Sequence, residues 1–308
     1  MTPIKHYLDL YKQMVLIREL ESTFWKMAKD TGEISDLHLN RGEEAIHLGV
    51  CAALNTSDYI LTHHRVISAY IAKGGQLQPL VDEILGHSTG IVGGRSGEMH
   101  IRDPSIGYIF SHQLVGTGAP VAAGVAWASR YVLKENKVTA LFIGDAATSN
   151  AQFHEGMNAA AIQKVPLLVV IEDNHTAGNI SPNYYLPDNI KIEDRFKAYG
   201  IQCFKVDGNK IDHVITVATT AIDIVRNSPR PVALICDTTR LAPHKIGQGD
   251  IRTPEQITEL SKRDPIPYTE KLLGLSEQQI NEIKDYTTKT ITEAIEKAHA
   301  APWPIWTE

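Results

Sequence analysis

Two short polar turns carry the residue types that a divalent metal ion and a phosphate group need. Asp145 comes two residues after the apolar run 138–143, and Asn174 comes shortly after a second apolar run at 167–171. The spacing of roughly 30 residues is that of one strand–helix–strand unit. An Asp carboxylate, an Asn amide oxygen and a backbone carbonyl are ligands that Mg²⁺ accepts, and a diphosphate can complete its octahedral shell.

The residues beside Asp145 fit a phosphate as well as a metal. Gly144 precedes it, and the small residues Ala146 and Ala147 lead into an expected helix start, where free N–H groups can meet phosphate oxygens. Taken alone, the two turns have an equally good structural explanation, because Asp often caps a helix and Asn often forms a turn. The helices and strands expected around these turns distinguish a metal and phosphate site from ordinary cap and turn residues.

Continuous apolar runs alternate with segments of helical periodicity in the middle of the chain. This pattern is typical of a parallel sheet with helices on both faces, an α/β fold. Ligands bind outside the carboxyl ends of the strands in such a sheet, so both polar turns are expected at one sheet edge. The expected strands are 138–143, 167–171, 202–206 and 232–236, and a helix is expected over 151–164.

The remaining segments are expected to complete one α/β domain over residues 1–308. Ser276 and Gln279 form a plausible capping box for the last helix. Glycines and prolines mark two irregular segments. We expect helices at 5–29, 41–55, 66–89 (interrupted at Gly74-Gly75) and about 277–299, a binding loop from Gly90 to Gly124, and a mobile loop at about 241–268.

The composition excludes several classes of protein. Hydrophobic residues make up 43% of the 308 residues, and the formal net charge is -6 without a basic block, so we expect neither nucleic acid nor an anionic membrane as partner. No apolar run is long enough for a membrane span, and no signal segment opens the sequence. Three scattered cysteines favour reduced thiols and a cytoplasmic location.

Several motifs occur in the same order as in a known family. The segment GDAATSNAQFHEGMNAAAIQKVPLLVVIEDN is similar to the thiamine diphosphate motif, Gly-Asp-Gly followed by Asn-Asn. The chain resembles the α subunits of thiamine-diphosphate-dependent 2-oxo acid dehydrogenases, acting on pyruvate, branched-chain 2-oxo acids or acetoin, over roughly residues 14–268. The other matching segments are IRELE, HLNRGEEA, GGRSGEMH (Gly-Gly-Ser-Met-His in the family), LVGTGAPVAAG and TTRLAPHKIGQGD.

The resemblance implies a set of binding residues. Mg²⁺ would be bound by Asp145, by Asn174 and by the backbone carbonyl of Thr176. Arg65 would grip the diphosphate, which its rigid fork of N–H groups suits. The positions implied to contact thiamine diphosphate are His64, Arg65, Gln113, Val115, Gly144, Asp145, Ala146, Ala147, Asn174 and His244.

Two histidines occupy motif positions that the resemblance links to catalysis. His38 lies in the early HLNRGEEA motif, near the substrate end of the expected site, and His244 lies in the late loop that closes over the cofactor. Imidazole can donate to an anionic substrate or transfer a proton near neutral pH. The chain has 13 histidines, so it is the motif that distinguishes these two from surface residues.

The sequence departs from the family pattern at several of these positions. Ala146 replaces the second glycine of Gly-Asp-Gly, Asp173 replaces the first Asn of the pair, and Thr176 replaces a tyrosine. His64 stands where the family has the tyrosine of Tyr-Arg, and Gln113 stands where it has a glycine. Such grouped changes indicate an unusual substrate or, alternatively, a degenerate site.

The resemblance also implies an activity and partners. The expected reaction is oxidative decarboxylation of a small 2-oxo acid, with transfer of the acyl group to a lipoyl-bearing acyltransferase component. The family's activating glutamate comes from a separate β subunit, so we expect an α2β2 heterotetramer. Three alternatives remain: an acetoin-cleaving dehydrogenase, the N-terminal half of a split transketolase, and a non-catalytic scaffold subunit.

Overall fold

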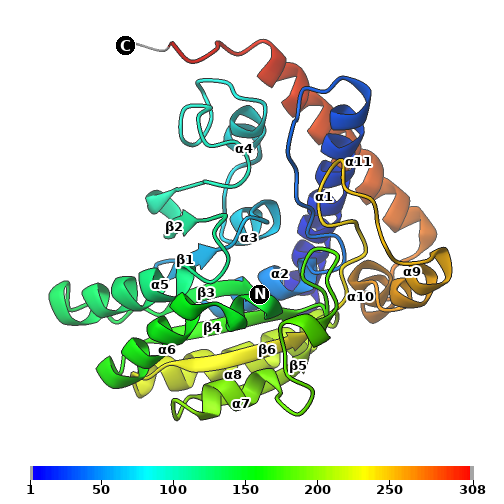
Figure 1. The fold of residues 1–308 in the computed structure, drawn as a ribbon. Helices are drawn as coiled ribbons and strands as arrows, with labels where there is room; N and C mark the ends of the chain where they lie inside the picture. The colour runs from blue at the N-terminus through cyan, green and yellow to red at the C-terminus, as the bar shows by residue number, and fades with distance from the viewer. Residues whose placement is uncertain (1–2, 306–308) are drawn as a thin grey trace.

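The structure is a computed structural model that describes residues 3–305, with side chains from His6 onward. Figure 1 shows a layered α/β arrangement, with a sheet in the lower half and the long helices α1 and α11 side by side along one flank. The helices are α1 (Pro3–Asp30), α2 (Glu44–Ala53), α3 (Ile67–Ala72), α4 (Leu77–Ile84), α5 (Gly118–Trp127), α6 (Ala151–Gln163), α7 (Ile192–Lys197), α8 (Ile211–Asn227), α9 (Pro254–Ser261), α10 (Pro265–Leu273) and α11 (Glu277–His299); short 3₁₀ or π turns are η1 (Pro104–Ile106), η2 (Ala128–Val132), η3 (Asp145–Ser149) and η4 (Pro182–Tyr184).

Six parallel strands form the sheet, in the order β2-β1-β3-β4-β6-β5. The strands β3 and β4 are neighbours, and Gly144 pairs with Glu172 where they end. The chain adds β2 on one side of β1 and then continues with β3 on the other side, so the sheet has a switch point between β1 and β3. The strands are β1 (Tyr59–Thr62), β2 (Tyr108–Ser111), β3 (Thr139–Gly144), β4 (Leu167–Asp173), β5 (Gln202–Asp207) and β6 (Val232–Asp237).

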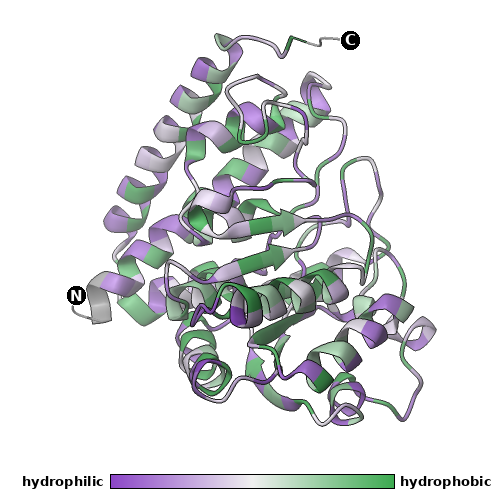
Figure 2. Ribbon diagram, turned by 90° about the vertical axis from the view of Figure 1, so that its left-hand side faces the viewer, coloured by the Kyte–Doolittle hydropathy of each residue, from purple (hydrophilic) through white to green (hydrophobic). Residues whose placement is uncertain are grey.

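Both faces of the sheet are buried, which explains why the central strands are apolar throughout. Alternate residues of one strand enter different cores: Phe142 packs on the α1–α2–α8 side, while Ile143 packs with α5, α6 and α7. Figure 2 shows the apolar strands enclosed between helices. The expected parallel α/β sheet with helices on both faces is confirmed.

The first and last helices lie where the sequence indicated. The helix expected at 5–29 is α1, and the helix expected at 277–299 is α11, whose capping box joins Ser276 and Gln279 in both directions. The expected loop at 241–268 is wrong in its second half, because all of α9 and the beginning of α10 lie there. Pro254 and Pro265 begin these helices instead of breaking them, since proline suits the first helical turn.

The Gly90–Gly124 segment is also more ordered than expected. It contains β2 and the first part of α5, both of which the sequence interpretation missed, as it missed β1. These two strands have four residues each, too few for periodicity to separate them from loops. In the described part of the chain all three cysteines are free thiols. No helix within it combines the length and apolar character required to cross a bilayer.

Candidate active site

A cavity of about 340 Å³ opens at the carboxyl ends of the strands. Segments that follow five of the six strands supply its walls, which places it at the switch point where ligands bind in open parallel sheets. The lining residues are His63, His64 and Arg65 after β1; His112, Val115 and Gly116 after β2; Ile143, Gly144, Asp145, Ala146 and Ala147 at β3; Glu172, Asn174, Thr176, Ala177 and Gly178 at β4; and Arg240 and His244 after β6.

Asp145 is buried directly after β3, and no Lys or Arg of the described residues forms an ion pair with it. Its carboxylate accepts hydrogen bonds from the N–H of Ala146 at 2.8 Å and from the hydroxyl of Tyr185 at 2.6 Å. Burial raises the pKa of Asp145 to about 7, the Tyr185 hydrogen bond opposes this shift, and the neighbouring carboxylate of Asp173 adds to it. A cation at this carboxylate would relieve both the burial and the repulsion.

Asn174 and Thr176 form a tight turn beside Asp145. The Asn174 side-chain oxygen accepts the N–H of Thr176 at 3.2 Å, and its amide group donates to Glu43 at 2.6 Å. Glu43 is the residue directly before α2, and its side chain is fully buried. It therefore fixes the orientation of Asn174, with the side-chain oxygen on the Thr176 side.

Asp173, the departure from the family's Asn-Asn pair, faces away from the main cavity. Its carboxylate lies 3.3 Å from Nδ1 of His175, whose Nε2 lies 2.7 Å from Asp237. His175 adopts a left-handed φ of 59°, which is uncommon outside glycine. Burial raises the pKa of Asp173, and His175 opposes that shift. The extra acid thus has its own partner outside the phosphate-sized space.

Two guanidinium groups line the opposite wall. Arg65 donates to the carbonyl of Leu39 at 2.5 Å and to the carbonyl of His244 at 3.1 Å, and Arg240 donates to the carbonyls of Gly178 and Ala242. No carboxylate in the described chain forms an ion pair with either group. Burial lowers the pKa of Arg240 to about 10, and Arg65 contributes to the shift. Two buried, mutually repelling cations make this wall attractive to an anion.

A buried glutamate supports the floor of the cavity. Glu172 lies between His63 at 2.9 Å and His47 at 3.0 Å. Burial alone would raise the pKa of Glu172, but the two imidazoles outweigh it and hold the pKa well below its usual range. His63 accepts the N–H of Arg65 through Nδ1 at 3.1 Å. These contacts fix the backbone at Arg65, the residue that the sequence linked to the diphosphate.

The two histidines linked to catalysis meet at one end of the cavity. The ring centroids of His38 and His244 are 5.1 Å apart, and His64 lies 4.5 Å from His38. His38 itself is buried behind the lining and bonds through Nδ1 to Glu98 at 2.7 Å. Burial, with Arg65 next, lowers the pKa of His38 to about 3 and that of His244 to about 4. Both imidazoles are therefore neutral at physiological pH.

One residue of the sequence-based set lies outside the cavity. Gln113 is exposed and does not line the space, although its neighbours His112 and Val115 do. Every other residue that the sequence linked to thiamine diphosphate or Mg²⁺ lies on the cavity wall, and His38 lies directly behind it. The role of Gln113 toward the cofactor stays a prediction, as do the roles of the others.

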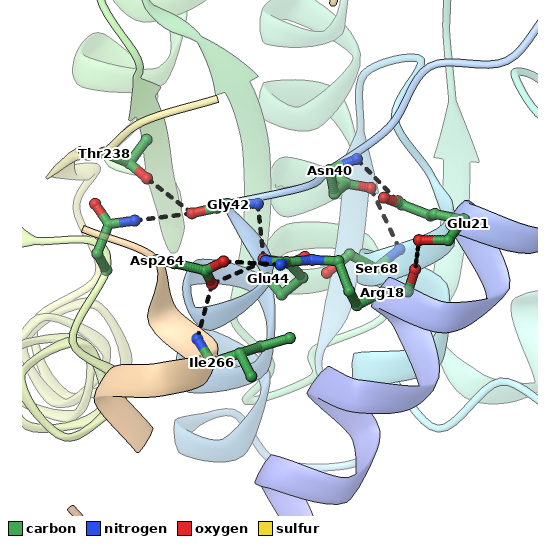
Figure 3. A network of polar contacts seen from close by, with 11 residues as sticks. Arg18, Glu21, Asn40, Gly42, Glu44, Ser68, Thr238, Asp264 and Ile266 are labelled. Atoms are coloured by element: carbon green, nitrogen blue, oxygen red, sulfur yellow. Dashed lines mark hydrogen bonds and ion pairs between the residues drawn. The ribbon is translucent and has the colours of Figure 1, made fainter. Parts of the chain in front are cut away.

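A buried ionic network positions the loop that carries His38 (Figure 3). Arg18 of α1 binds Glu44 at 2.6 Å and Asp264, the N-cap of α10, at 2.9 Å. Glu44 also accepts the N–H of Gly42 at 2.9 Å. Gly42 has a φ of 97°, and a Cβ there would lie 2.3 Å from the carbonyl oxygen of Thr239. Glycine is thus required where the two active-site loops touch.

The donor set fits thiamine diphosphate and Mg²⁺. A buried carboxylate and an oriented amide oxygen supply the hard oxygen ligands that Mg²⁺ prefers, and Arg65 with Arg240 supplies the positive wall for a diphosphate. The sequence interpretation missed Arg240, Glu43, Glu172 and Glu98. All four lie inside segments that match the family, so the motifs were a usable signal, but only the fold shows which side chains they contact.

Comparison with known proteins agrees with this geometry. The family model described as "Dehydrogenase E1 component" matches residues 11–305. Among curated relatives, the α subunit of acetoin:2,6-dichlorophenolindophenol oxidoreductase of Bacillus subtilis is 34% identical, covering 94% of this chain and 86% of its own. The pyruvate dehydrogenase E1 α subunit of Porphyra purpurea is 30% identical, covering 96% and 89%.

A third relative, the chloroplastic pyruvate dehydrogenase E1 α-3 subunit of Oryza sativa, is 30% identical over 96% of this chain and 73% of its own. These matches extend across α1, the sheet and α11, so they include every segment that lines the cavity. The family match over nearly the whole chain is conclusive: this chain belongs to the dehydrogenase E1 component family.

Proposed function

We propose that the chain is the α subunit of a thiamine-diphosphate-dependent 2-oxo acid dehydrogenase, which decarboxylates a small 2-oxo acid oxidatively and passes the acyl group to a lipoyl-bearing acyltransferase component. The observation that carries the proposal is the convergence of Asp145, Asn174 and Thr176 on the same cavity as Arg65 and Arg240. Metal ligands and an anion-binding wall on one cavity are what a metal diphosphate requires. Family membership supports the same reading.

The cofactor-binding roles follow from the donor set. Asp145, Asn174 and the carbonyl of Thr176 would hold Mg²⁺, while Arg65 and Arg240 would neutralise the diphosphate. Thiamine diphosphate, when bound, supplies a carbanion for addition to the 2-oxo carbon and an electron sink for loss of carbon dioxide. The protein has to orient the reactants, exclude water and move protons.

His38 and His244 offer complementary proton-transfer atoms. In the tautomer in which Nδ1 of His38 donates to Glu98, its Nε2 is left as a proton acceptor. His244 accepts an N–H of Arg65 through Nδ1 at 3.1 Å, so its Nε2 carries the proton and acts as a donor. A neutral acceptor beside a neutral donor suits both proton removal and proton delivery at the substrate end.

An apolar surface beside the cavity suits a β subunit. Leu114 is 71% exposed and Val115 is 49% exposed, although Val115 also lines the cavity. The relatives are named as α subunits, and we propose a β partner and an α2β2 assembly, in a cytoplasmic setting, for this chain. Further exposed apolar residues continue along α5 and η2: Val121, Trp127, Tyr131, Val132 and Leu133.

Reconstitution with the β subunit tests the proposal. The purified assembly is supplied with thiamine diphosphate, Mg²⁺ and a panel of 2-oxo acids, and reduction of an artificial electron acceptor is followed. We expect oxidation that requires both cofactors. Reaction with ketose phosphates alone would instead identify half of a transketolase, and calorimetry showing no thiamine diphosphate binding with β present would identify a scaffold subunit.

Acetoin is the second candidate substrate. The relative from Bacillus subtilis, at 34% identity, is named for acetoin oxidation. The neutral state of His38 and His244 also suits an uncharged substrate end. Including acetoin in the same panel separates the two functions: a kcat/KM for acetoin far above that for every 2-oxo acid would replace the main proposal.

A further inference from the structure

Three imidazoles from three separate loops meet at the substrate end of the cavity. His38 comes from the loop between α1 and α2, His64 from the segment after β1, and His244 from the segment after β6. One ring nitrogen of each lies within 4.8 Å of the other two. Two ligands of a tetrahedral zinc ion lie about 3.4 Å apart when each Zn–N bond is about 2.0–2.1 Å. Rotation of the rings can close the difference.

A buried carboxylate already orients one of these rings. Glu98 is 4% exposed, and its Oε1 is 2.7 Å both from Nδ1 and from the backbone nitrogen of His38. A carboxylate bonded to the second nitrogen of a histidine is the usual support of a metal-binding imidazole, because it fixes the ring and its tautomer. Nε2 of His38 is then the nitrogen free to coordinate.

Two buried atoms in this group have no hydrogen-bond partner among the residues that the structure describes. They are Oε2 of Glu98 and Nε2 of His64, each with almost no solvent contact. A cation shared by the imidazoles would give Nε2 of His64 the partner that it lacks.

Both residues are also departures from the family patterns. His64 stands where the Tyr-Arg pair has tyrosine, and Glu98 stands where Gly-Gly-Ser-Met-His has serine. They come from different motifs, yet in the fold both contact the ring of His38. The two changes therefore create one arrangement: three imidazoles with a carboxylate behind them.

We propose that His38, His64 and His244 form a binding site for a zinc-class divalent ion, separate from the Mg²⁺ site at Asp145. Imidazole nitrogens suit zinc and related transition metals, whereas Mg²⁺ prefers oxygen ligands. Three protein ligands leave a fourth position open to water or to an oxygen of the substrate. The two ends of the cavity thus select different ions by the chemistry of their donors.

Arg65 has to adjust when a metal ion binds. It donates through Nη2 both to Nδ1 and to the carbonyl oxygen of His244, each at 3.1 Å. Coordination through either ring nitrogen removes Nδ1 as an acceptor, because Nδ1 then carries a proton or the metal. Arg65 keeps its hydrogen bond to the carbonyl oxygen of His244 and still lines the cavity that we assign to the diphosphate. Metal binding and cofactor binding are therefore compatible.

The ion would regulate the reaction. Because it would occupy the nitrogens of His38 and His244 that we assign to proton exchange with substrate, bound zinc would inhibit turnover. This consequence rests on the proposed function, whereas the metal site itself rests only on the geometry.

Titration of the full chain with Co²⁺ tests the site without an activity assay. Tetrahedral Co²⁺ absorbs visible light strongly, and the titration is run in excess Mg²⁺ so that the oxygen site is filled. We expect one equivalent of Co²⁺ to give tetrahedral bands that Zn²⁺ removes. His64→Tyr should abolish the bands, and Glu98→Gln should weaken Co²⁺ binding by about 10–100-fold. His213→Gln, at an exposed position of α8, is the matched control.

The outcomes separate this inference from the proposed function. No tetrahedral bands in wild type, or bands that persist unchanged in folded His64→Tyr and His38→Gln chains, would overturn the metal site even if thiamine diphosphate binds. Bands with the expected variant pattern, in a chain that never binds thiamine diphosphate with its β subunit, would support the metal site and refute the proposed function. Circular dichroism establishes that each variant is folded.

Discussion

The two ends of the cavity are built in different ways. At the end that we assign to the diphosphate, Asp145 and Asn174 follow the adjacent strands β3 and β4, and parallel pairing brings them together directly. At the histidine end, His38, His64 and His244 come from loops far apart in the sequence. The positions of Asp145 and Asn174 follow from one strand–helix–strand unit, while the histidine end depends on the packing of the whole domain.

This difference determines which substitutions should disrupt each end of the cavity. A change at the first end acts on ligand chemistry alone, because the sheet holds the backbone rigidly. The second end can also be lost through distant residues that position its loops, such as the Arg18 network of Figure 3. Variants at each end, and in their shared support, should therefore separate cofactor binding from turnover and from stability.

The largest effect is expected at Asp145. Asp145→Asn removes the charged ligand proposed for Mg²⁺, so the Mg²⁺-dependent affinity for thiamine diphosphate should fall by about 100-fold or more, roughly 2.7 kcal/mol. Calorimetry on the assembly with the β subunit measures it. Asp223→Asn, at an exposed position of α8, is the control for the loss of one negative charge and should change the affinity far less. Equal losses in both variants would contradict the assignment.

A substitution at the histidine end should lower turnover and leave cofactor affinity nearly unchanged. His38→Gln removes the proposed proton acceptor but leaves the metal and diphosphate ligands untouched. We expect kcat to fall by about 100-fold, within the usual range for a general acid or base, with little change in the affinity for thiamine diphosphate. Steady-state kinetics and calorimetry on the same preparation check both halves. A lost cofactor affinity would show that the two ends are not independent.

Gly42 connects the loops of both ends, so its replacement should act on the whole domain. Gly42→Ala places a Cβ 2.3 Å from the carbonyl oxygen of Thr239 at a φ of 97°. We expect a loss of about 1–3 kcal/mol in the free energy of unfolding, measured by urea denaturation. Gly249→Ala is the control, because a Cβ there meets nothing within 4 Å. Similar losses at both positions would exclude the steric explanation.

The contrast also explains what could be predicted from sequence. The strands β3 to β6, the terminal helices and the turns that carry Asp145 and Asn174 follow from apolar runs, caps and local spacing. Ser276 and Gln279 marked the start of α11 correctly, because a capping box is a local signal. Pro254 and Pro265 were interpreted as loop residues, because proline marks both a break and a first helical turn.

For the histidine end, the sequence predicted single residues but not their contacts with one another. Family motifs pointed to His38 and His244, but the approach of His64 and the supporting role of Glu98 depend on loop packing. Gln113 shows the opposite case. It lies two positions before Val115, yet its side chain is exposed outside the cavity, since neighbouring residues in a loop need not share a face.

A pH dependence of stability is expected beneath the histidine end. Glu21 of α1 is buried and accepts the N–H of Asn40 at 2.8 Å, in the loop that carries His38. Burial raises the pKa of Glu21 to about 8, and the neighbouring carboxylate of Glu44 adds to the shift. Between its ordinary pKa and about 8, the folded chain holds a proton that the unfolded chain has released. Stability should therefore fall as pH rises through this window, by at most about 1.4 kcal/mol per pH unit.

Glu21→Gln should remove this contribution while its side-chain oxygen still accepts the N–H of Asn40. The midpoint of thermal unfolding, compared with wild type from about pH 5 to about pH 8, should shift progressively in favour of the variant. Glu282→Gln, at an exposed position of α11, controls for the loss of one negative charge. If the curves of wild type and Glu21→Gln run parallel, Glu21 is not protonated in the fold. The loop of the histidine end would then be held by a buried carboxylate, as Arg18 is by Glu44.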